Sequence, residues 1–401
     1  VPAMLFKVII FVALVVFTNG YDDYEVRRPP PDTFLNVKQL IEKYRYPFEN
    51  HTVQTEDGYM LQIHRIPHGR NSKGNITRPA VLVVPGVFCS SADWVNMGPE
   101  RSLGFILADE GYDVWLANTR GTRWSRKHAW LDPDVDKKEY WTFSFQQIGE
   151  YDLPELIDHI LDQTNQEKLF YIGHSQGTTS FFALTSSKPE YNKKVRLSIT
   201  LAPAAYAGHM RGLLINFFAI FEDQIAEYLK KYERYETFPH NPLLSLIASG
   251  LCQDGVPTQE ICALVFHVAG GYSNQLNKTM IPVIATNTPA GASKVQGLHY
   301  GQLFKSKKFR KYDYGEEKNL EIYGQSSPPD YDLSRITAPL AMYYGDKDLY
   351  CNKEDVDRTA AEVSNLVTKK VIKGFNHLDV LWGIDVVRLV FKDVIELMKQ
   401  Y

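Results

Sequence analysis

Ser175 lies in the sequence Gly173-His174-Ser175-Gln176-Gly177, directly after the apolar run at residues 169–172 and before a helix-like stretch that begins near Thr178. A G-x-S-x-G pattern between a strand and a helix predicts a tight elbow, whose small glycines relieve crowding and expose the serine hydroxyl. Such a pattern also occurs by chance in Gly-rich turns, but here both flanking elements are present. The sequence therefore predicts Ser175 as a nucleophile.

A nucleophilic serine needs an imidazole to take its proton and a carboxylate to orient that imidazole. Where the serine sits on a strand-to-helix elbow, the acid and then the histidine follow it along the chain. Asp346 and Asp348 follow the apolar run at residues 340–344, and His377 is the only histidine after them. His377 is the predicted base. Both aspartates remain candidates for the acid, because residues two apart on an extended segment point the same way.

Attack on a carbonyl carbon also builds negative charge on the carbonyl oxygen, which N–H donors must stabilise. At a serine elbow, one donor is the backbone N–H of the next residue, here Gln176, and the other comes from the loop after an early strand. Pro85-Gly86-Val87 follows the apolar run at residues 80–84, so Val87 is the predicted second donor. The alternative for this loop is an ordinary strand-ending turn.

The elements that must position these residues follow from the pattern of apolar runs. Runs that are apolar on both faces occupy residues 80–84, 112–117, 169–172, 195–201 and 340–344, with a shorter one at 371–372. Such runs are typical of a parallel sheet that helices cover on both sides. Between two of them, a helical stripe is formed by Leu153, Leu156, Ile157, Ile160 and Leu161. We expect an α/β fold with a mostly parallel central sheet, preceded by a hairpin over residues 53–66.

The strand–helix rhythm is lost between residues 205 and 330 and returns at Leu340. We interpret residues 205–330 as a mainly helical cap or lid inserted into a core formed by residues 21–204 and 331–401. Within the cap, the apolar run at residues 213–221 is either an interfacial helix or a helix packed on the core.

The N-terminal residues 1–20 resemble a signal peptide. Lys7 precedes an unbroken apolar run at residues 8–17, and small residues follow at Thr18 and Gly20. The run is shorter than the roughly 20 apolar residues that span a bilayer, which disfavours the alternative of a membrane anchor. No later stretch is long and apolar enough for a transmembrane segment, so we expect a secreted protein, with a lysosomal destination as the alternative.

In a secreted protein, cysteines can form disulfides and N-x-[ST] sequons can be glycosylated. Cys252 and Cys262 are close enough in sequence to close a small loop, but four cysteines allow three pairings, and the state of Cys89 and Cys351 stays open. The predicted glycosylation sites are Asn50, Asn75 and Asn277.

Composition and charge exclude other classes of protein. The formal net charge is −3, which lacks the basic character of a nucleic-acid-binding protein. The 44% hydrophobic and 13% aromatic content disfavours disorder.

No metal-ligand spacing accompanies His174 or His299. We predict neither a metal nor a cofactor, and His174 is expected to pack beside the elbow.

Several longer motifs resemble the acid lipase family, which comprises gastric lipase, lysosomal acid lipase and secreted invertebrate relatives. The resemblance extends from about Asn36 to the C-terminus. Its motifs are Thr55-Glu56-Asp57-Gly58-Tyr59, Asp113-Val114-Trp115-Leu116-Ala117-Asn118 with Arg120-Gly121, Tyr151-Asp152-Leu153-Pro154, the Ser175 elbow with Thr178-Thr179, Pro289-Ala290-Gly291-Ala292-Ser293 and Asn376-His377-Leu378-Asp379.

The resemblance implies an α/β-hydrolase fold with a movable lid, and hydrolysis of triacylglycerols or cholesteryl esters through Ser175 and His377. It places the catalytic acid on Asp348, the oxyanion donors on Val87 and Gln176, and a cap disulfide on Cys252 and Cys262. One position differs: the family's early loop usually reads His-Gly-Leu, where this chain has Pro85-Gly86-Val87. Since the donor is a backbone N–H, the change bears on rate or acyl preference rather than on the reaction.

The expected partner is a lipid substrate at an oil–water or membrane interface, while the oligomeric state is left open. A lipid-binding or storage protein without catalysis is one alternative, although all three triad positions are filled. A soluble carboxylesterase or thioesterase is the other, since one fold hosts many reactions.

Overall fold

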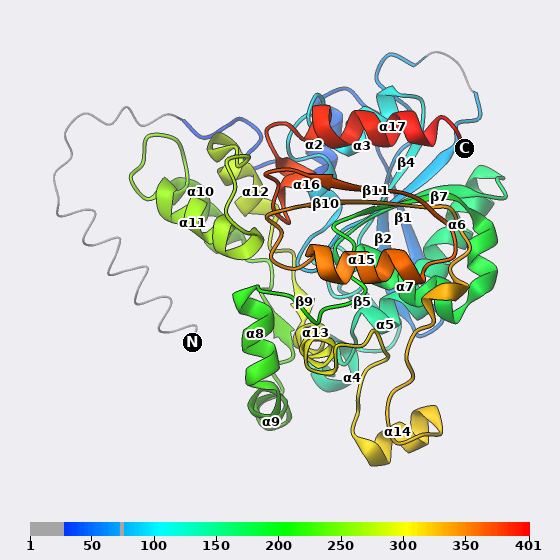
Figure 1. Ribbon diagram of the computed structural model, residues 1–401. Helices are drawn as coiled ribbons and strands as arrows, with labels where there is room; N and C mark the ends of the chain where they lie inside the picture. The colour runs from blue at the N-terminus through cyan, green and yellow to red at the C-terminus, as the bar shows by residue number, and fades with distance from the viewer. Residues whose placement is uncertain (1–27, 73–75) are drawn as a thin grey trace.

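A nine-stranded sheet runs through the centre of the molecule (Figure 1). Its strands lie in the order β1-β2-β4-β3-β6-β7-β10-β11, with the short β5 beside β2. The computed structural model describes residues 28–72 and 76–401, so the predicted signal peptide and Asn75 lie outside the described residues. Within these ranges, no helix has the length and apolar character needed to cross a bilayer.

The sheet is antiparallel at its first edge and parallel in the remainder. β1 and β2 form the predicted hairpin, β2 pairs antiparallel with β4, and the strands from β4 to β11 pair in parallel. All residues of β3, β4, β6 and β10 are buried, as runs apolar on both faces predict. The bounds are β1 Glu49–Gln54, β2 Tyr59–Ile66, β3 Ala80–Val84, β4 Asp113–Ala117, β5 Lys127–His128, β6 Leu169–His174, β7 Val195–Leu201, β10 Leu340–Gly345 and β11 Leu366–Ile372.

Helices cover both faces of this sheet (Figure 1). One face carries α2 (Val37–Lys43), α3 (Leu103–Asp109) and α17 (Lys392–Met398), and the other carries α6 (Leu153–Thr164), α7 (Gln176–Ser187) and α15 (Lys353–Glu362). α6 buries the apolar stripe that its sequence predicts and ends at Asn165 in the left-handed conformation. Shorter helices are α4 (Lys137–Trp141), α5 (Phe145–Gln147) and α16 (Asp379–Trp382). These observations confirm the predicted α/β class.

The long segment between β7 and β10 is mainly helical, with residues 213–287 to the left of the sheet and residues 294–323 below it (Figure 1). It contains α8 (Leu213–Ile220), α9 (Glu222–Tyr232), α10 (Pro242–Leu251), α11 (Gln259–Gly270), α12 (Ile281–Asn287), α13 (Lys294–Ser306) and α14 (Glu316–Tyr323), with β8 (Glu236–Thr237) paired to β9 (Ala292–Ser293). We use the name cap for residues 205–330. The cap meets the core at the carboxyl ends of the parallel strands, where Ala290 N–H donates to the Phe88 carbonyl at 2.7 Å.

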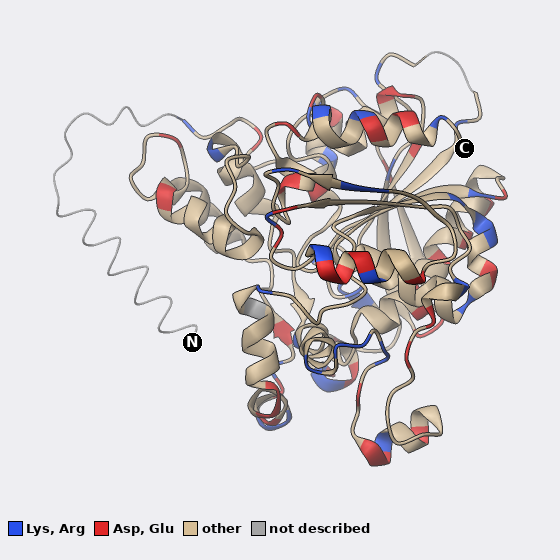
Figure 2. Ribbon diagram, viewed as in Figure 1, with Lys and Arg blue, Asp and Glu red and all other residues tan. Residues whose placement is uncertain are grey.

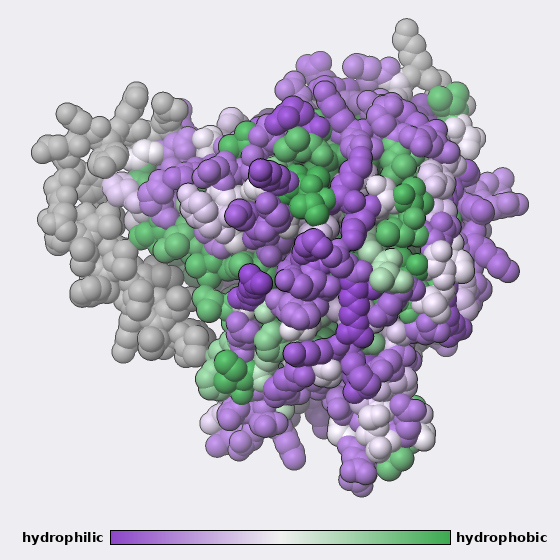
Figure 3. Space-filling model, in the orientation of Figure 1, coloured by the Kyte–Doolittle hydropathy of each residue, from purple (hydrophilic) through white to green (hydrophobic). Residues whose placement is uncertain are grey.

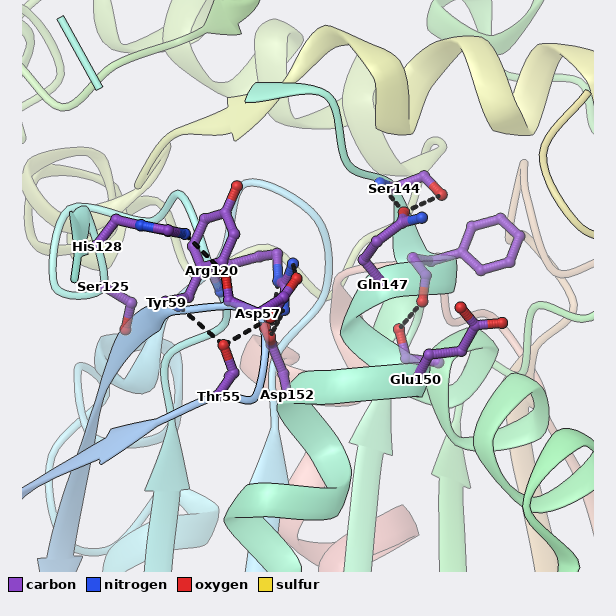
Figure 4. A network of polar contacts seen from close by, with 12 residues as sticks. Thr55, Asp57, Tyr59, Arg120, Ser125, His128, Ser144, Gln147, Glu150 and Asp152 are labelled. Carbon is purple, nitrogen blue, oxygen red and sulfur yellow. Dashed lines mark hydrogen bonds and ion pairs between the residues drawn. The ribbon is translucent and has the colours of Figure 1, made fainter. Parts of the chain in front are cut away.

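A buried ion-pair network joins three segments on which the family resemblance rests (Figure 4). Arg120, after β4, donates to Asp152, before α6, at 2.7 Å, and to Asp57, in the hairpin turn, at 2.6 Å. Thr55 donates to Asp57 at 2.7 Å, and the Arg120 guanidinium lies 4.0 Å from the centre of the Tyr59 ring. Residues of these three motifs are therefore in direct contact, and they link the hairpin, the loop after β4 and the start of α6.

Candidate active site

Ser175 occupies a strained turn between β6 and α7. Its φ is 50° and its ψ −116°, a conformation that a non-glycine residue adopts only when its surroundings enforce it. The Ser175 N–H donates to the Leu201 carbonyl at 2.9 Å, which fixes the turn to the end of β7. This geometry is the predicted elbow, and it turns the serine side chain away from the helix that follows.

Close packing explains why glycines flank the serine. A Cβ atom on Gly177 would lie 2.5 Å from the Val84 carbonyl oxygen at the end of β3. A Cβ on Gly173 would lie 2.9 Å from the Gly177 carbonyl carbon. Both distances are shorter than real Cβ contacts, so any larger residue would displace the elbow from the neighbouring strand.

Ser175, His377 and Asp348 form a continuous hydrogen-bonded chain. The Ser175 hydroxyl donates to His377 Nε2 at 2.8 Å, and His377 Nδ1–H donates to Asp348 Oδ2 at 2.9 Å and to Oδ1 at 3.0 Å. All three residues are buried. A serine, a base within hydrogen-bond reach and a carboxylate behind the base are the arrangement that activates a hydroxyl for attack on an acyl carbon.

The two candidate aspartates after β10 have different environments. Asp348 is buried, and besides His377 its Oδ1 accepts the backbone N–H groups of Tyr350 at 2.7 Å and Cys351 at 2.9 Å. Asp346 is exposed and accepts the Gly374 N–H at 2.6 Å. Of the two, Asp348 is therefore the one that contacts the imidazole.

The loop after β3 packs directly against the elbow. A Cβ on Gly86 would lie 3.1 Å from the Ser175 Cβ and 3.0 Å from His174 Nδ1, so the loop backbone passes close to the serine. In the part of the chain that the structure describes, neither the Val87 N–H nor the Gln176 N–H donates to a protein acceptor. Both groups therefore remain available as hydrogen-bond donors near Ser175.

His174 and His299 are both buried and form hydrogen bonds with protein groups. His174 is fully buried, its Nε2–H donates to the His377 carbonyl at 3.0 Å, and burial and the nearby His377 lower its pKa to about 3. His299 bonds Ser144 at 2.8 Å and the Arg310 carbonyl at 2.9 Å, and burial lowers its pKa to about 3. Both rings are therefore neutral and structural, and His174 packs beside the elbow.

The cysteines and sequons occupy distinct environments. Cys252 and Cys262 form a disulfide between α10 and α11 in the cap, while Cys89 and Cys351 carry free, buried thiols in the described structure. The Cys351 thiol donates to the Ala202 carbonyl at 3.1 Å, and burial raises its pKa. Asn50 is exposed on β1 and Asn277 is partly exposed before α12. Their glycosylation remains a prediction.

Comparison with known proteins places the chain in a family. A family model described as "alpha/beta hydrolase fold" matches residues 79–384, and one described as "partial alpha/beta-hydrolase lipase region" matches residues 37–98. Gastric triacylglycerol lipase of Bos taurus is 37% identical over 372 residues, which are 92% of this chain and 92% of that protein. Lysosomal acid lipase/cholesteryl ester hydrolase of Rattus norvegicus is 36% identical over 403 residues, 99% of each.

Solved structures agree on the fold. The carboxylesterase CesB of Bacillus subtilis matches with a TM-score of 0.50 at 13% identity, over 91% of this chain and 96% of that one. This match supports the predicted fold, and the family models and the relatives above confirm the predicted resemblance. The chain belongs to the α/β-hydrolase lipase family that includes gastric lipase and lysosomal acid lipase.

Proposed function

We propose that the protein is a serine lipase that hydrolyses carboxylic esters of neutral lipids, such as triacylglycerols or cholesteryl esters, through an acyl-enzyme on Ser175. The observation that carries the proposal is the unbroken chain of hydrogen bonds from Asp348 through His377 to Ser175 on the strained elbow. Relatives of 36–37% identity are named triacylglycerol lipase and cholesteryl ester hydrolase.

The geometry supports a two-step reaction. His377 Nε2 takes the hydroxyl proton as Ser175 Oγ attacks the ester carbonyl carbon, and Asp348 stabilises the imidazolium that forms. The N–H groups of Val87 and Gln176 then stabilise the oxyanion. His377 returns the proton to the departing alcohol, and the ester bond breaks to leave the acyl group on Ser175. A water molecule, deprotonated by His377, releases the fatty acid and restores the serine.

The cap surface favours a lipid substrate over a soluble ester. Large apolar side chains are exposed along three of its helices: Leu213, Phe217 and Ile220 on α8, Leu243, Leu244, Leu246 and Ile247 on α10, and Leu264, Val265 and Val268 on α11. These helices carry few charges (Figure 2), and apolar side chains gather on the cap side of the molecule (Figure 3). Extended apolar patches of this kind mark a membrane or protein contact. We propose that this surface contacts the lipid interface.

The triad contacts and the exposed apolar side chains of the cap also argue against the two alternative functions. A lipid-storage protein would not need three aligned triad side chains, and a soluble esterase would not need so much exposed apolar surface.

The disulfide is compatible with an oxidising compartment. We propose that the protein is secreted, with delivery to lysosomes as the alternative.

The test is hydrolysis of emulsified triolein by the purified protein and by Ser175→Ala, at about pH 5 and about pH 7.5. We expect fatty-acid release by the parent and at least a thousandfold lower release, on the order of the loss seen when a triad member is removed, by the variant. A folded parent that hydrolyses neither triolein nor a short-chain ester would refute the proposal.

A further inference from the structure

The C-terminal end of α11 lies between the loop that carries Asp348 and the loop that carries His377. The His377 N–H donates to the Gly270 carbonyl at 3.1 Å, and Asn376 Nδ2 donates to the Gly271 carbonyl at 2.6 Å. Both bonds link the cap to the base loop. The loop that carries the imidazole is therefore held by the cap as well as by the core.

Asn376 is buried, and the two ends of its side-chain amide bond two different segments of the chain. Its Oδ1 accepts the N–H groups of Leu378 at 2.8 Å and Asp379 at 3.0 Å, which fixes the turn after the histidine. Its Nδ2 points the other way, to Gly271 in the cap. The amide therefore connects the local turn to α11.

Gly271 contacts the acid loop. Its φ of +111° is a conformation that side chains other than glycine rarely adopt, and a Cβ there would lie 2.3 Å from the Lys347 carbonyl oxygen. Lys347 N–H in turn donates to the Phe375 carbonyl at 2.8 Å. The end of α11, the acid loop and the base loop thus form a closed set of backbone contacts, directly beside Asp348 and His377.

We infer that Gly271 and Asn376 are positioning residues, through which the cap holds Asp348 and His377 in register with Ser175. The inference rests on the proposed function and deepens it. α11 also exposes Leu264, Val265 and Val268, so the helix proposed to contact lipid ends on the two catalytic loops. A displacement of about 1 Å at a reacting group can cost on the order of a hundredfold in rate, so small shifts of this helix matter.

The first test compares two glycine substitutions in the cap. In Gly271→Ala, the new methyl meets the Lys347 carbonyl, whereas in Gly250→Ala, on α10, it has no atom within 4 Å. On a soluble short-chain ester, we expect Gly271→Ala to lower kcat by about 10- to 100-fold with KM changed by less than about threefold. Gly250→Ala should behave as the parent. A Gly271→Ala kcat within about twofold of the parent would overturn the inference.

The second test replaces one atom of the Asn376 amide. In Asn376→Asp, a protonated carboxyl can donate to the Gly271 carbonyl as the amide does, whereas a carboxylate repels it. The charged or titratable groups around this position are Asp379, His377 and Asp348, with Lys347 on the acid loop and His267 on α11. Burial and the Asp379 carboxylate should raise the pKa of the new carboxyl.

We therefore expect Asn376→Asp to approach the parent kcat at about pH 4.5 and to fall about tenfold below it at about pH 7. Asn376→Ala should be slow at both values. An Asn376→Asp profile parallel to that of the parent would contradict the inference, as would a loss that only follows the fraction of unfolded protein measured by circular dichroism.

A spectroscopic measurement separates this inference from the proposed function. The His377 Nδ1 proton, shared with Asp348, should give a downfield NMR resonance that disappears in His377→Gln. The inference predicts that this resonance shifts in Gly271→Ala and Asn376→Ala but not in Gly250→Ala. Unshifted resonances would overturn it, whether or not the parent hydrolyses any ester.

Discussion

At the scale of single residues, Asp346 and Asp348 differ in their hydrogen bonds, and this difference supports Asp348 as the proposed catalytic acid. Both follow β10, but Asp348 is buried against His377 and accepts two backbone N–H groups, whereas Asp346 faces solvent and bonds Gly374. A carboxylate that holds the imidazole tautomer contributes to each proton transfer, and an exposed one does not.

Asparagine substitutions should separate the two positions. We expect Asp348→Asn to lower kcat on a soluble ester by about three to four orders of magnitude, because the amide no longer favours the Nδ1–H tautomer of His377. Asp346→Asn should stay within about threefold of the parent. Equal losses in the two variants would show that the acid has been assigned wrongly.

Much of the site could be predicted from sequence, since the elbow and the order serine, acid, histidine leave one possible base. The choice between Asp346 and Asp348 could not be derived that way. It depends on a turn after β10, where the alternation of an extended strand no longer applies. The contacts of Gly271 and Asn376 were also not predicted, because they join segments 105 residues apart in the chain.

At the scale of secondary structure, the Arg120 network holds the hairpin, the loop after β4 and α6 together. Arg120 is buried, and its guanidinium neutralises Asp152, which is buried, and Asp57, which is partly exposed. Burial raises the pKa of Asp152 to about 6 even with this partner. The network is therefore sensitive to the loss of the Arg120 cation.

Arg120→Met should leave the buried Asp152 carboxyl without its ionic partner and without the N–H donors of the guanidinium, and should raise its pKa further. We expect the free energy of unfolding in urea at neutral pH to fall by about 3–5 kcal/mol. The matched control is Arg388→Met, since Arg388 is exposed and pairs with Asp385 at 3.1 Å, and its cost should stay below about 0.5 kcal/mol. Similar costs for the two variants would contradict a structural role for the network.

The sequence predicts the bounds of buried strands better than those of an edge strand. β3 and β7 match the predicted runs at residues 80–84 and 195–201, because strands buried on both faces are continuously apolar. β11 was expected only at residues 371–372 but spans Leu366–Ile372. It is an edge strand whose Lys369 and Lys370 are exposed, so its sequence lacks both the apolar run and the alternation.

At the scale of the whole molecule, a buried carboxyl makes the stability of the fold depend on pH. Asp93, just after the loop of Val87, accepts the Ser90 N–H at 2.6 Å and the hydroxyl of Thr288, in the cap, at 2.7 Å. Burial raises its pKa from 3.8 to about 6. Since the folded-state pKa is the higher one, its contribution to stability is complete below about pH 4 and is lost as pH rises through about 6.

Asp93→Asn removes this titration. We expect the free energy of unfolding of the parent to decline relative to that of the variant between about pH 4 and pH 7, by up to about 3 kcal/mol. Urea unfolding of both proteins across this range measures the difference. A difference that is constant, or that grows in favour of the parent as pH rises, would contradict the assignment.

The apolar cap surface should matter for emulsions and not for dissolved esters. We expect Leu264→Ser with Val265→Ser to lower the rate on emulsified triolein by about tenfold while the rate on a soluble ester changes by less than about twofold. Val135→Ser, at a more exposed apolar position outside the cap, is the control. Equal effects on both substrates would argue against an interfacial role for α11.

Covalent labelling directly tests whether Ser175 is the nucleophile. A p-nitrophenyl alkylphosphonate, which resembles the tetrahedral intermediate, should modify the parent once, and peptide mass spectrometry should place the adduct on Ser175. His377→Ala should lower the labelling rate by at least about a hundredfold, because the hydroxyl loses its base. No adduct on a folded parent, or an adduct on another residue with Ser175 unmodified, would contradict the proposal that Ser175 is the nucleophile.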